Sequence, residues 1–227
     1  MDQTENIDLR IDHAPTTLRQ LAVDRIRQAI ISGRFAGGDR LVERTLCDQL
    51  GVSRSVVREA IRYLEAEGLV ETQARSGPMV ATLDWARAQQ VYDIRRLLEA
   101  EAAAACARMA DAKIKDRLKA ALATLESAVS DADPGRIYEA TTRFYETIFL
   151  AAGHEIAWEV VQRLNGRISR LRALTLATTD RRISGPAHMA RICAAICDND
   201  AAAAAKAVRD HLTNASDIAR KLLETAK

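Results

Sequence analysis

The chain has 227 residues, of which 48% are hydrophobic, and this length and composition suffice to bury one or two ordinary cores. No stretch approaches the ~20 uncharged apolar residues that a membrane span requires, and the acidic, polar start MDQTENIDLRID is unlike a secretory signal. The formal net charge of +2 is too small to indicate nucleic-acid binding by itself. We therefore expect a globular cytoplasmic protein with no membrane partner, whose function depends on where its charges lie.

The cysteines do not predict a disulfide framework. Four are present, too few and too irregularly spaced for a chain of this length: Cys47, Cys106, Cys193 and Cys197. The last two stand four residues apart, so both could face one metal ion from a single helix. Isoleucines lie beside them in ARICAAIC, which favours apolar core packing over ligation.

The N-terminal part of the chain begins with a tail and two predicted helices. Residues 1–15 contain no periodic pattern of apolar side chains that could be buried, and they are expected to be flexible. Apolar side chains in residues 18–31 recur at helical spacing after Thr17, a candidate N-cap. A second helix fits residues 43–50, and Gly51 after it can supply the left-handed backbone of a tight turn.

The third predicted helix lies in VSRSVVREAIRYLEAEG, residues 52–68, where Ser53 is well placed to cap it. Helical spacing predicts a buried stripe of Val57, Ala60, Ile61 and Leu64. The opposite side carries Arg54, Ser55, Arg58 and Arg62. Positive side chains at a helix N-terminus add to the positive end of the helix dipole. Such an arrangement is locally unfavourable unless an anion binds there.

A short hairpin is predicted after Gly68. Two extended runs, LVETQ and MVATL, are joined by Ala74-Arg75-Ser76-Gly77-Pro78, a composition typical of a turn. The tip carries Arg75 and no acid. Residues 16–83 as a whole contain ten arginines, no lysine and eight acidic residues, so a case for DNA binding depends on placement and not on net charge.

A helix, a tight turn, a second helix and a two-stranded wing form a winged helix-turn-helix, in which the second helix enters the major groove of DNA. Arginine suits this helix because its planar guanidinium can donate to guanine O6 and N7 together, and it also binds phosphate. The alternative to DNA contact is that Arg58 and Arg62 form only surface ion pairs with nearby glutamates, from Glu59 to Glu67. We favour DNA contact for Arg54 and Arg58, and surface pairing for Arg62.

From Asp84 onward the pattern is helical almost throughout. About six alanine-rich helices are expected, with breaks near Asp111, at Asp133-Pro134-Gly135, near Gly153, from Thr178 to Pro186 and near Asn199. Short connections favour antiparallel packing. The expected fold is mainly α: a tail in residues 1–15, a winged helix-turn-helix in residues 16–83, and an all-α antiparallel helical bundle in residues 84–227.

The stretch GDRLVERTLCDQLGVSRSVVREAIRYLEAEGLVE closely resembles the DNA-binding domain of the GntR family of bacterial transcription regulators. The resemblance covers residues 18–83. It implies that DNA is held by an arginine of the second helix, by arginines and a small polar residue at the start of the third, and by a glycine at the wing tip. These positions are Arg44, Arg54, Ser55, Arg58 and Gly77, to which we add Arg75 from the wing.

The second domain resembles the all-helical ligand-binding domain of the FadR subfamily, the FCD domain, through VYDIRRLLEAEAAAACA and FYETIFLAAGHEIAW. The resemblance covers residues 84–222 and implies a cavity for a small-molecule effector, since many relatives respond to carboxylate metabolites or acyl thioesters. Arg95 could meet an anionic group of such an effector, or it could pair with Glu99 one turn further along. The sequence leaves both open.

Many members of this subfamily bind a divalent metal through one aspartate and three histidines. The resemblance places Thr141, Tyr145, Met189 and His211 at these four positions, with His188 one residue before the third. One residue turns a helix by about 100°, so we expect His188 to point away from the cavity. One histidine with threonine, tyrosine and methionine is no ordinary metal site. We therefore expect these residues and Arg95 to line an effector pocket with no metal or other cofactor.

The sequence thus predicts a homodimeric transcription regulator that binds double-stranded, palindromic operator DNA and responds to a small molecule in its helical domain. We expect a repressor. The alternatives are an activator of the same family and an architectural DNA binder without effector control. An enzyme is disfavoured, because His211 has no obvious nucleophile or carboxylate partner in the sequence and no phosphate-binding glycine loop is present.

Overall fold

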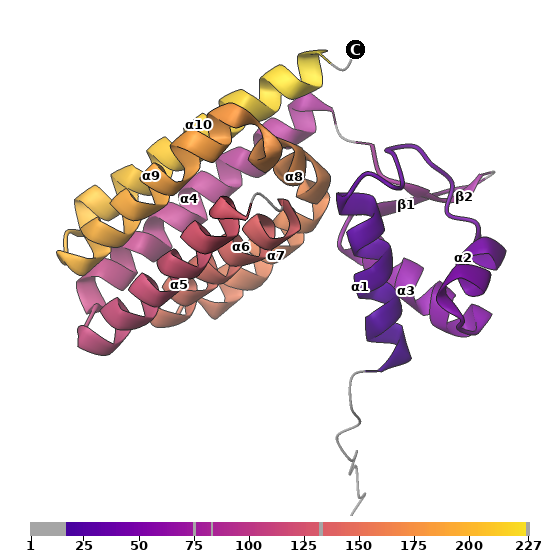
Figure 1. Ribbon diagram of the computed structural model, residues 1–227, viewed down its shortest axis with the longest axis horizontal. Coiled ribbons are helices and arrows are strands. Elements are labelled where there is room, and N and C mark those ends of the chain that lie inside the picture. The colour runs from indigo at the N-terminus through magenta and orange to yellow at the C-terminus, as the bar shows by residue number, and fades with distance from the viewer. Residues whose placement is uncertain (1–16, 75, 83, 132–133, 226–227) are drawn as a thin grey trace, which may run out of the picture.

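The computed structural model describes residues 17–74, 76–82, 84–131 and 134–225. These residues form ten helices and one two-stranded sheet, arranged as a small N-terminal unit beside a larger helical bundle (Figure 1). The predicted mainly α fold, with a winged helix-turn-helix followed by a bundle, is confirmed. No helix among the described residues is both long enough and apolar enough to cross a bilayer.

The N-terminal unit consists of α1 (Leu18–Ile31), α2 (Glu43–Leu50), α3 (Arg54–Ala66), β1 (Val70–Gln73) and β2 (Gly77–Val80). Apolar side chains from all five elements share one core. Its fully buried members include Val23, Ile26, Leu41, Val57, Ala60 and Leu64. This core fixes α3 against α1 and leaves the arginine side of α3 outside.

The predicted caps set the ends of these helices. The side chain of Thr17 accepts a hydrogen bond from the backbone N–H of Gln20 at 3.2 Å. Ser53 accepts from the backbone N–H of Val56 at 3.5 Å, at the start of α3. Gly51 between α2 and α3 has a φ of 66°, a left-handed conformation that favours glycine. Gly51 and the Ser53 cap therefore explain the tight turn between the two helices, as the sequence predicted.

The wing is shorter than predicted. β1 and β2 pair antiparallel, with Val70 opposite Val80 and Gln73 opposite Gly77. The second strand already begins at Gly77, so Gly77 and Pro78 belong to the strand and not to the turn. Proline is tolerated in such a two-stranded ribbon because an edge position does not require its missing N–H.

The bundle contains seven helices within the described residues: α4 (Trp85–Met109), α5 (Ala112–Ser130), α6 (Pro134–Ala151), α7 (Glu155–Arg167), α8 (Ser169–Ala177), α9 (Thr179–Cys197) and α10 (Ala201–Thr225). The two longest, α4 and α10, lie along each other, α9 packs on α10, and α5 packs on α6 (Figure 1). Small side chains let α4 approach its neighbours closely, because its buried residues include Ala100, Ala102, Ala103, Ala104, Ala105 and Ala107.

Two helix boundaries in the bundle differ from the prediction. α7 and α8 separate at Ile168, where φ is −111° and ψ is 14°, so there are seven helices where about six were expected. The predicted break from Thr178 to Pro186 is confined to Thr178, and Pro186 lies inside α9. A proline inside a helix costs about 3 kcal/mol. Packing offsets this cost, since the inner face of α9 is buried at Met189, Ile192 and Ile196.

Candidate nucleic-acid interface and effector cavity

The outer side of α3 carries the residues that the sequence singled out. Arg54, Ser55 and Arg58 are exposed, whereas Val57 and Leu64 on the opposite side are completely buried. The side chains of Arg54 and Arg58 are 63% and 57% exposed. They stand at the N-terminal end of the helix, where the helix dipole is also positive. This end of α3 therefore presents a positive surface to solvent.

Glu43, at the start of α2, contacts both arginines. Arg58 Nε donates to Glu43 Oε1 and Oε2, at 2.9 and 3.0 Å, and Arg54 Nε lies 3.5 Å from Oε2. The alternative that Arg58 pairs with acids of its own helix is therefore wrong, since its partner comes from the preceding helix. No ion pair of Arg62 occurs among the described residues, so its predicted pairing is not seen either. The sequence analysis did not single out Glu43 as the partner of these arginines.

The contacts of Glu43 leave the Nη groups of both arginines available. Both contacts use Nε, and no hydrogen bond among the described residues uses an Nη group of Arg54 or Arg58. The Nη groups are the fork that binds a phosphate or the edge of a guanine. Glu43 therefore orients the two guanidinium groups without occupying that fork.

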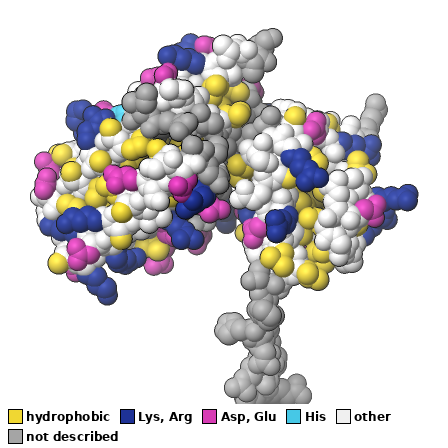
Figure 2. Space-filling model, in the orientation of Figure 1, with side chains coloured by type: hydrophobic (Ala, Val, Ile, Leu, Met, Phe, Trp, Pro, Cys, Tyr) yellow, Lys and Arg dark blue, Asp and Glu magenta, His cyan; other side chains and the backbone are white. Residues whose placement is uncertain are grey.

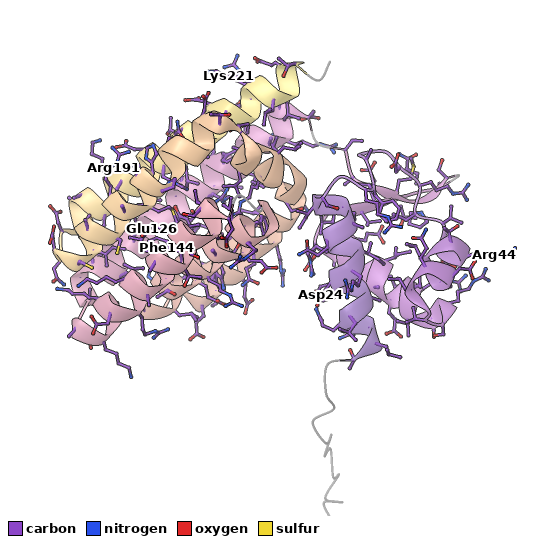
Figure 3. The ribbon with its side chains drawn as sticks, viewed as in Figure 1. Asp24, Arg44, Glu126, Phe144, Arg191 and Lys221 are labelled. Carbon is purple, nitrogen blue, oxygen red and sulfur yellow. The ribbon has the colours of Figure 1, made fainter. Side chains whose placement is uncertain are left out.

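The remaining predicted DNA contacts lie beside α3. Arg44 on α2 is exposed and projects from the edge of the N-terminal unit that faces away from the bundle (Figure 3). Basic side chains, which are all arginine in residues 16–83, also project from that edge in the space-filling view (Figure 2). Gly77 has a φ of 75°, with open space where a Cβ would stand. Arg75, predicted at the wing tip, lies outside the described residues.

Two small cavities adjoin each other inside the bundle, each of about 20 Å³. Thr141, Leu176 and His211 line both of them. The first is otherwise mainly apolar, with Leu125, Val129, Ile137, Pro186 and Met189 in its wall. The second is more polar, and its wall includes Tyr92, Arg95, Arg172 and Thr175. We call these two spaces together the effector cavity.

The structure brings the five predicted effector residues together. Thr141, Met189, His211 and Arg95 line the effector cavity, and Tyr145 stands behind His211, with 5.9 Å between the ring centroids. They come from α4, α6, α9 and α10, which are far apart in the chain. These residues come together because the four helices pack against one another in the bundle.

Arg95 is paired with Glu99, the second of the two alternatives that the sequence left open. Its Nε lies 2.7 Å from Glu99 Oε1, and the two side chains are only 4% and 1% exposed. Burial alone would lower the pKa of Arg95, but the charge of Glu99 and the nearby Tyr92 raise this pKa above its ordinary value. The charge of Arg95 is therefore already balanced by a protein carboxylate.

A second buried arginine, Arg172 on α8, was not singled out by the sequence. Its guanidinium carbon lies 4.6 Å from the centroid of the Tyr138 ring, and the residue is 6% exposed. Its Nη1 has no hydrogen-bond partner among the described residues. Burial, with a further contribution from Arg95, lowers the pKa of Arg172. Arginine in a helix is mostly exposed, so no sequence signal marked this residue.

The residues at the four metal positions do not fit a divalent ion. Thr141 Oγ1 donates to the backbone carbonyl of Ile137 at 2.7 Å, and Met189 offers only a thioether. No three histidine, cysteine, aspartate or glutamate side chains among the described residues gather into a group that could hold a metal. The donor set is thus unsuited to the ion that the resemblance implies.

His188 lies closer to the cavity than predicted. Its ring centroid is 5.8 Å from that of His211, although Met189 and not His188 lines the cavity. The expectation that His188 points away is therefore wrong in part, because a turn of about 100° carries a side chain to the flank of a helix and not to its far side. Arg191 Nη2 lies 2.7 Å from His188 Nδ1, and this positive neighbour disfavours a cation there.

The N-terminal unit and the bundle meet where α3 and α7 end. A Cβ on Gly166 would lie 2.8 Å from the carbonyl oxygen of Glu67, and a Cβ on Gly68 would lie 2.5 Å from Cγ of Arg167. Arg27 of α1 holds Glu67 through an ion pair of 3.0 Å. A cleft of about 680 Å³ opens beside these contacts, and residues of both parts line it, including Tyr63, Glu67, Tyr138, Asn165 and Ser169.

Comparison with known proteins identifies a family for each of the two parts of the chain. Residues 18–80 match the family described as bacterial regulatory proteins, gntR family, and residues 90–214 match the FCD domain. The chain is 25% identical over 221 residues to the HTH-type transcriptional regulator YdhC of Bacillus subtilis, covering 97% of this chain and 98% of that protein. It is 24% identical over 201 residues to the HTH-type transcriptional repressor RspR of Escherichia coli, covering 87% and 86%.

Solved structures show the same fold. The structure of E. coli McbR/YncC matches with a TM-score of 0.79 at 18% identity, over 92% of this chain and 99% of that chain. The crystal structure of a GntR transcriptional regulator from Rhodococcus sp. RHA1 matches with a TM-score of 0.74 at 21% identity, over 92% of this chain and 98% of that chain.

Proposed function

Because the chain belongs to the gntR family of bacterial regulatory proteins and carries an FCD domain, we propose that this transcription regulator is a homodimeric repressor of a palindromic operator, controlled by a small metabolite. The family consists of transcription regulators and not of enzymes. Regulators of this family bind DNA, and FCD domains bind small-molecule effectors. Acting on chromosomal DNA, the protein works in the cytoplasm.

The observation that carries the DNA-binding proposal is the exposed N-terminal end of α3. Arg54, Ser55 and Arg58 stand there in solvent, and Glu43 holds the two arginines by Nε with the Nη groups available. Arg44 extends the same surface from α2, on the side away from the bundle (Figure 3). This geometry fits a recognition helix in the major groove, with arginines on phosphates and on guanine edges.

Two further features support a symmetric repressor. Ile94 and Leu97 on α4 are 41% and 73% exposed, which fits a surface that a second copy of the chain covers. A two-fold dimer presents two identical recognition helices, so its operator is an imperfect palindrome. The relative RspR is a repressor, and this favours repression over activation for the present chain.

Control by a metabolite is supported by the effector cavity. It lies inside the bundle and has an apolar part around Met189 and a polar part around Arg95 and Arg172. A ligand that binds one arrangement of the bundle and the N-terminal unit better than another changes the affinity of the protein for DNA. Because Arg95 is already paired with Glu99, the anionic group of an effector requires another partner.

Selection of binding sites from random DNA tests the DNA-binding proposal. The enriched sequences should be imperfect palindromes with half-sites about one helical turn apart, and native mass spectrometry should find two chains on each duplex. One isolated half-site bound by a single chain would contradict the dimer. A reporter gene behind the selected operator should be less active in the presence of the protein, and higher activity would identify an activator instead.

A further inference from the structure

We propose that the cleft between the N-terminal unit and the bundle is a second ligand site, which binds an uncharged planar nitrogen heterocycle of the nucleobase type. The cleft holds about 680 Å³, within the range of small-molecule sites, and none of its described lining residues lines the effector cavity. Because the site lies apart from that cavity and its test requires no DNA, it stands independently of the proposed function.

Two buried polar side chains in the wall of the cleft have an oxygen without a partner. Asn165, near the end of α7, is 5% exposed, and Ser169, at the start of α8, is 1% exposed. Both line the cleft, and neither Asn165 Oδ1 nor Ser169 Oγ has a hydrogen-bond partner among the described residues. A buried polar group without a partner is unfavourable. A ligand that hydrogen-bonds to both side chains removes this cost.

The carboxamide of Asn165 determines which ligand edge fits. It carries an acceptor oxygen and an N–H donor side by side, and its soft terminal torsion lets the group turn toward a ligand. An asparagine carboxamide pairs in this way with the edge of adenine, which offers a donor beside an acceptor. The hydroxyl of Ser169, four residues further along the chain, can donate or accept. The ligand therefore has an N–H donor and an acceptor on the same edge.

Two tyrosines line the cleft, one from each part of the chain. Tyr63 belongs to α3 and is 43% exposed, and Tyr138 belongs to α6. The guanidinium carbon of Arg172 lies 4.6 Å from the centroid of the Tyr138 ring, so one face of this ring is covered and only the other can receive a ligand. Every nucleobase has a flat π-face and stacks on aromatic side chains. The two tyrosines thus favour a planar ring system.

The charges in the wall of the cleft cancel. Arg27 of α1 is paired with Glu67 at 3.0 Å, and Glu159 and Arg163 of α7 contribute one charge of each sign. An anionic ligand would meet two carboxylates as well as two guanidinium groups, and so would a cationic one. Since neither sign of charge is complemented by this wall, an uncharged ligand is favoured over a phosphate or a carboxylate.

Isothermal titration calorimetry on the full chain without DNA tests the ligand class. Adenine, hypoxanthine, cytosine and uracil are titrated at millimolar concentration, with caffeine and inorganic phosphate as controls. At least one base should bind. Caffeine, a planar ring system without an N–H donor, should bind more weakly than that base, and phosphate should not bind. No binding by any of the four bases, equal binding by caffeine, or binding by phosphate alone would overturn the proposed class.

Asn165→Leu tests where the base binds. Its affinity for the base should fall by roughly 5- to 150-fold, because the ligand loses its partner. Its Tm without ligand should equal or exceed that of the wild type, because an unpaired buried polar group is removed. Asn214→Leu is the matched control: Asn214 Oδ1 accepts from Ser184 Oγ at 3.0 Å, so this variant should have a lower Tm and wild-type base affinity. Undiminished base binding by Asn165→Leu, or a lowered Tm, would overturn the role of Asn165.

Tyr63→Ala tests whether the N-terminal unit contributes to the site. Tyr63 is partly exposed, so the fold should be retained, but base affinity should fall by roughly 5- to 150-fold as stacking is lost. Tyr63→Phe keeps the aromatic ring and should bind the base as the wild type does. Unchanged base affinity in Tyr63→Ala would show that the base contacts the bundle alone, and would overturn a site shared by the two parts of the chain.

Discussion

Gly166 lies so close to Glu67 that a Cβ at position 166 would be 2.8 Å from the carbonyl oxygen of Glu67. Gly166 is near the end of α7 in the bundle, and Glu67 caps the C-terminus of α3. The contact therefore joins the bundle directly to the helix that carries Arg54 and Arg58. Only glycine permits this approach, because any other residue would push a side chain into the backbone of α3.

Replacing this glycine should separate the two parts without unfolding either. In Gly166→Ala, the new methyl group cannot fit beside Glu67, so the N-terminal unit must move away from α7. Alanine is the better helix former by up to about 1 kcal/mol, so the bundle itself should not melt earlier. Small-angle X-ray scattering should give a larger radius of gyration and operator affinity should change. A variant with the wild-type radius of gyration and operator affinity would show that this contact does not fix the position of the N-terminal unit.

Glu43 should govern specificity more than total DNA affinity. Glu43→Gln removes the carboxylate that holds Arg54 and Arg58, and it also removes a negative charge near the DNA phosphates. Exposed ion pairs contribute less than about 1 kcal/mol, so the fold should be retained. The ratio of operator affinity to scrambled-DNA affinity should fall, measured by fluorescence anisotropy at one salt concentration. An equal gain on both duplexes would mean that Glu43 acts only by repulsion.

Divalent metals should not stabilise the wild type. Its Tm should be the same with EDTA as with added Zn²⁺ or Ni²⁺, because a single imidazole cannot hold the ion. The variant Thr141→Asp, Tyr145→His, Met189→His rebuilds an aspartate and two histidines around His211. Metal at ~100 times its dissociation constant should stabilise that variant by about 2.7 kcal/mol. In a chain of this size that is roughly 5–10 °C in Tm.

A metal-dependent Tm in the wild type would contradict the donor set described above. His188 would then be the first residue to replace, because its ring lies 5.8 Å from that of His211. His188→Ala in such a protein should abolish the metal effect.

Two thiols should resist alkylation in the folded protein. Burial, with the nearby Cys197, raises the pKa of Cys193 to about 12 and that of Cys106 to about 11. The reactive thiolate is therefore nearly absent at neutral pH. Mass spectrometry after iodoacetamide treatment should find both unmodified in the native protein and modified in denaturant. Since folding holds these protons more tightly, stability should fall as the pH rises above about 9.

Local signals made the helix-turn-helix predictable. Gly51 and Ser53 fix the turn and the next helix start through backbone conformation and capping, and each acts on residues within a few positions of itself. The buried stripe on α3 follows from the helical period alone. The break at Ile168 was not predicted, although Gly166 stands two residues before it, because Gly166 lies inside α7 and no side chain caps the start of α8.

Contacts between distant segments could not be predicted in the same way. The pair of Arg58 and Glu43 spans fifteen residues and two helices, so it depends on the angle at which α2 packs on α3. Arg172 is buried only because α8 lies against α6 and α10. The approach of Gly166 to Glu67 likewise requires the assembled chain. The proposed recognition residues could thus be predicted from the sequence, whereas the residues that contact them from other helices could not.

Operator affinity of Arg58→Ala, compared with Arg108→Ala, tests the DNA-binding assignment most directly. The two arginines are equally exposed, at 57% and 56%, but Arg108 lies on α4 in the bundle. Arg58→Ala should lose ~1–3 kcal/mol of binding per half-site, and about twice that in the dimer. Arg108→Ala should bind as the wild type does. Undiminished operator binding by Arg58→Ala with an unchanged circular dichroism spectrum would contradict the assignment of α3 as the recognition helix.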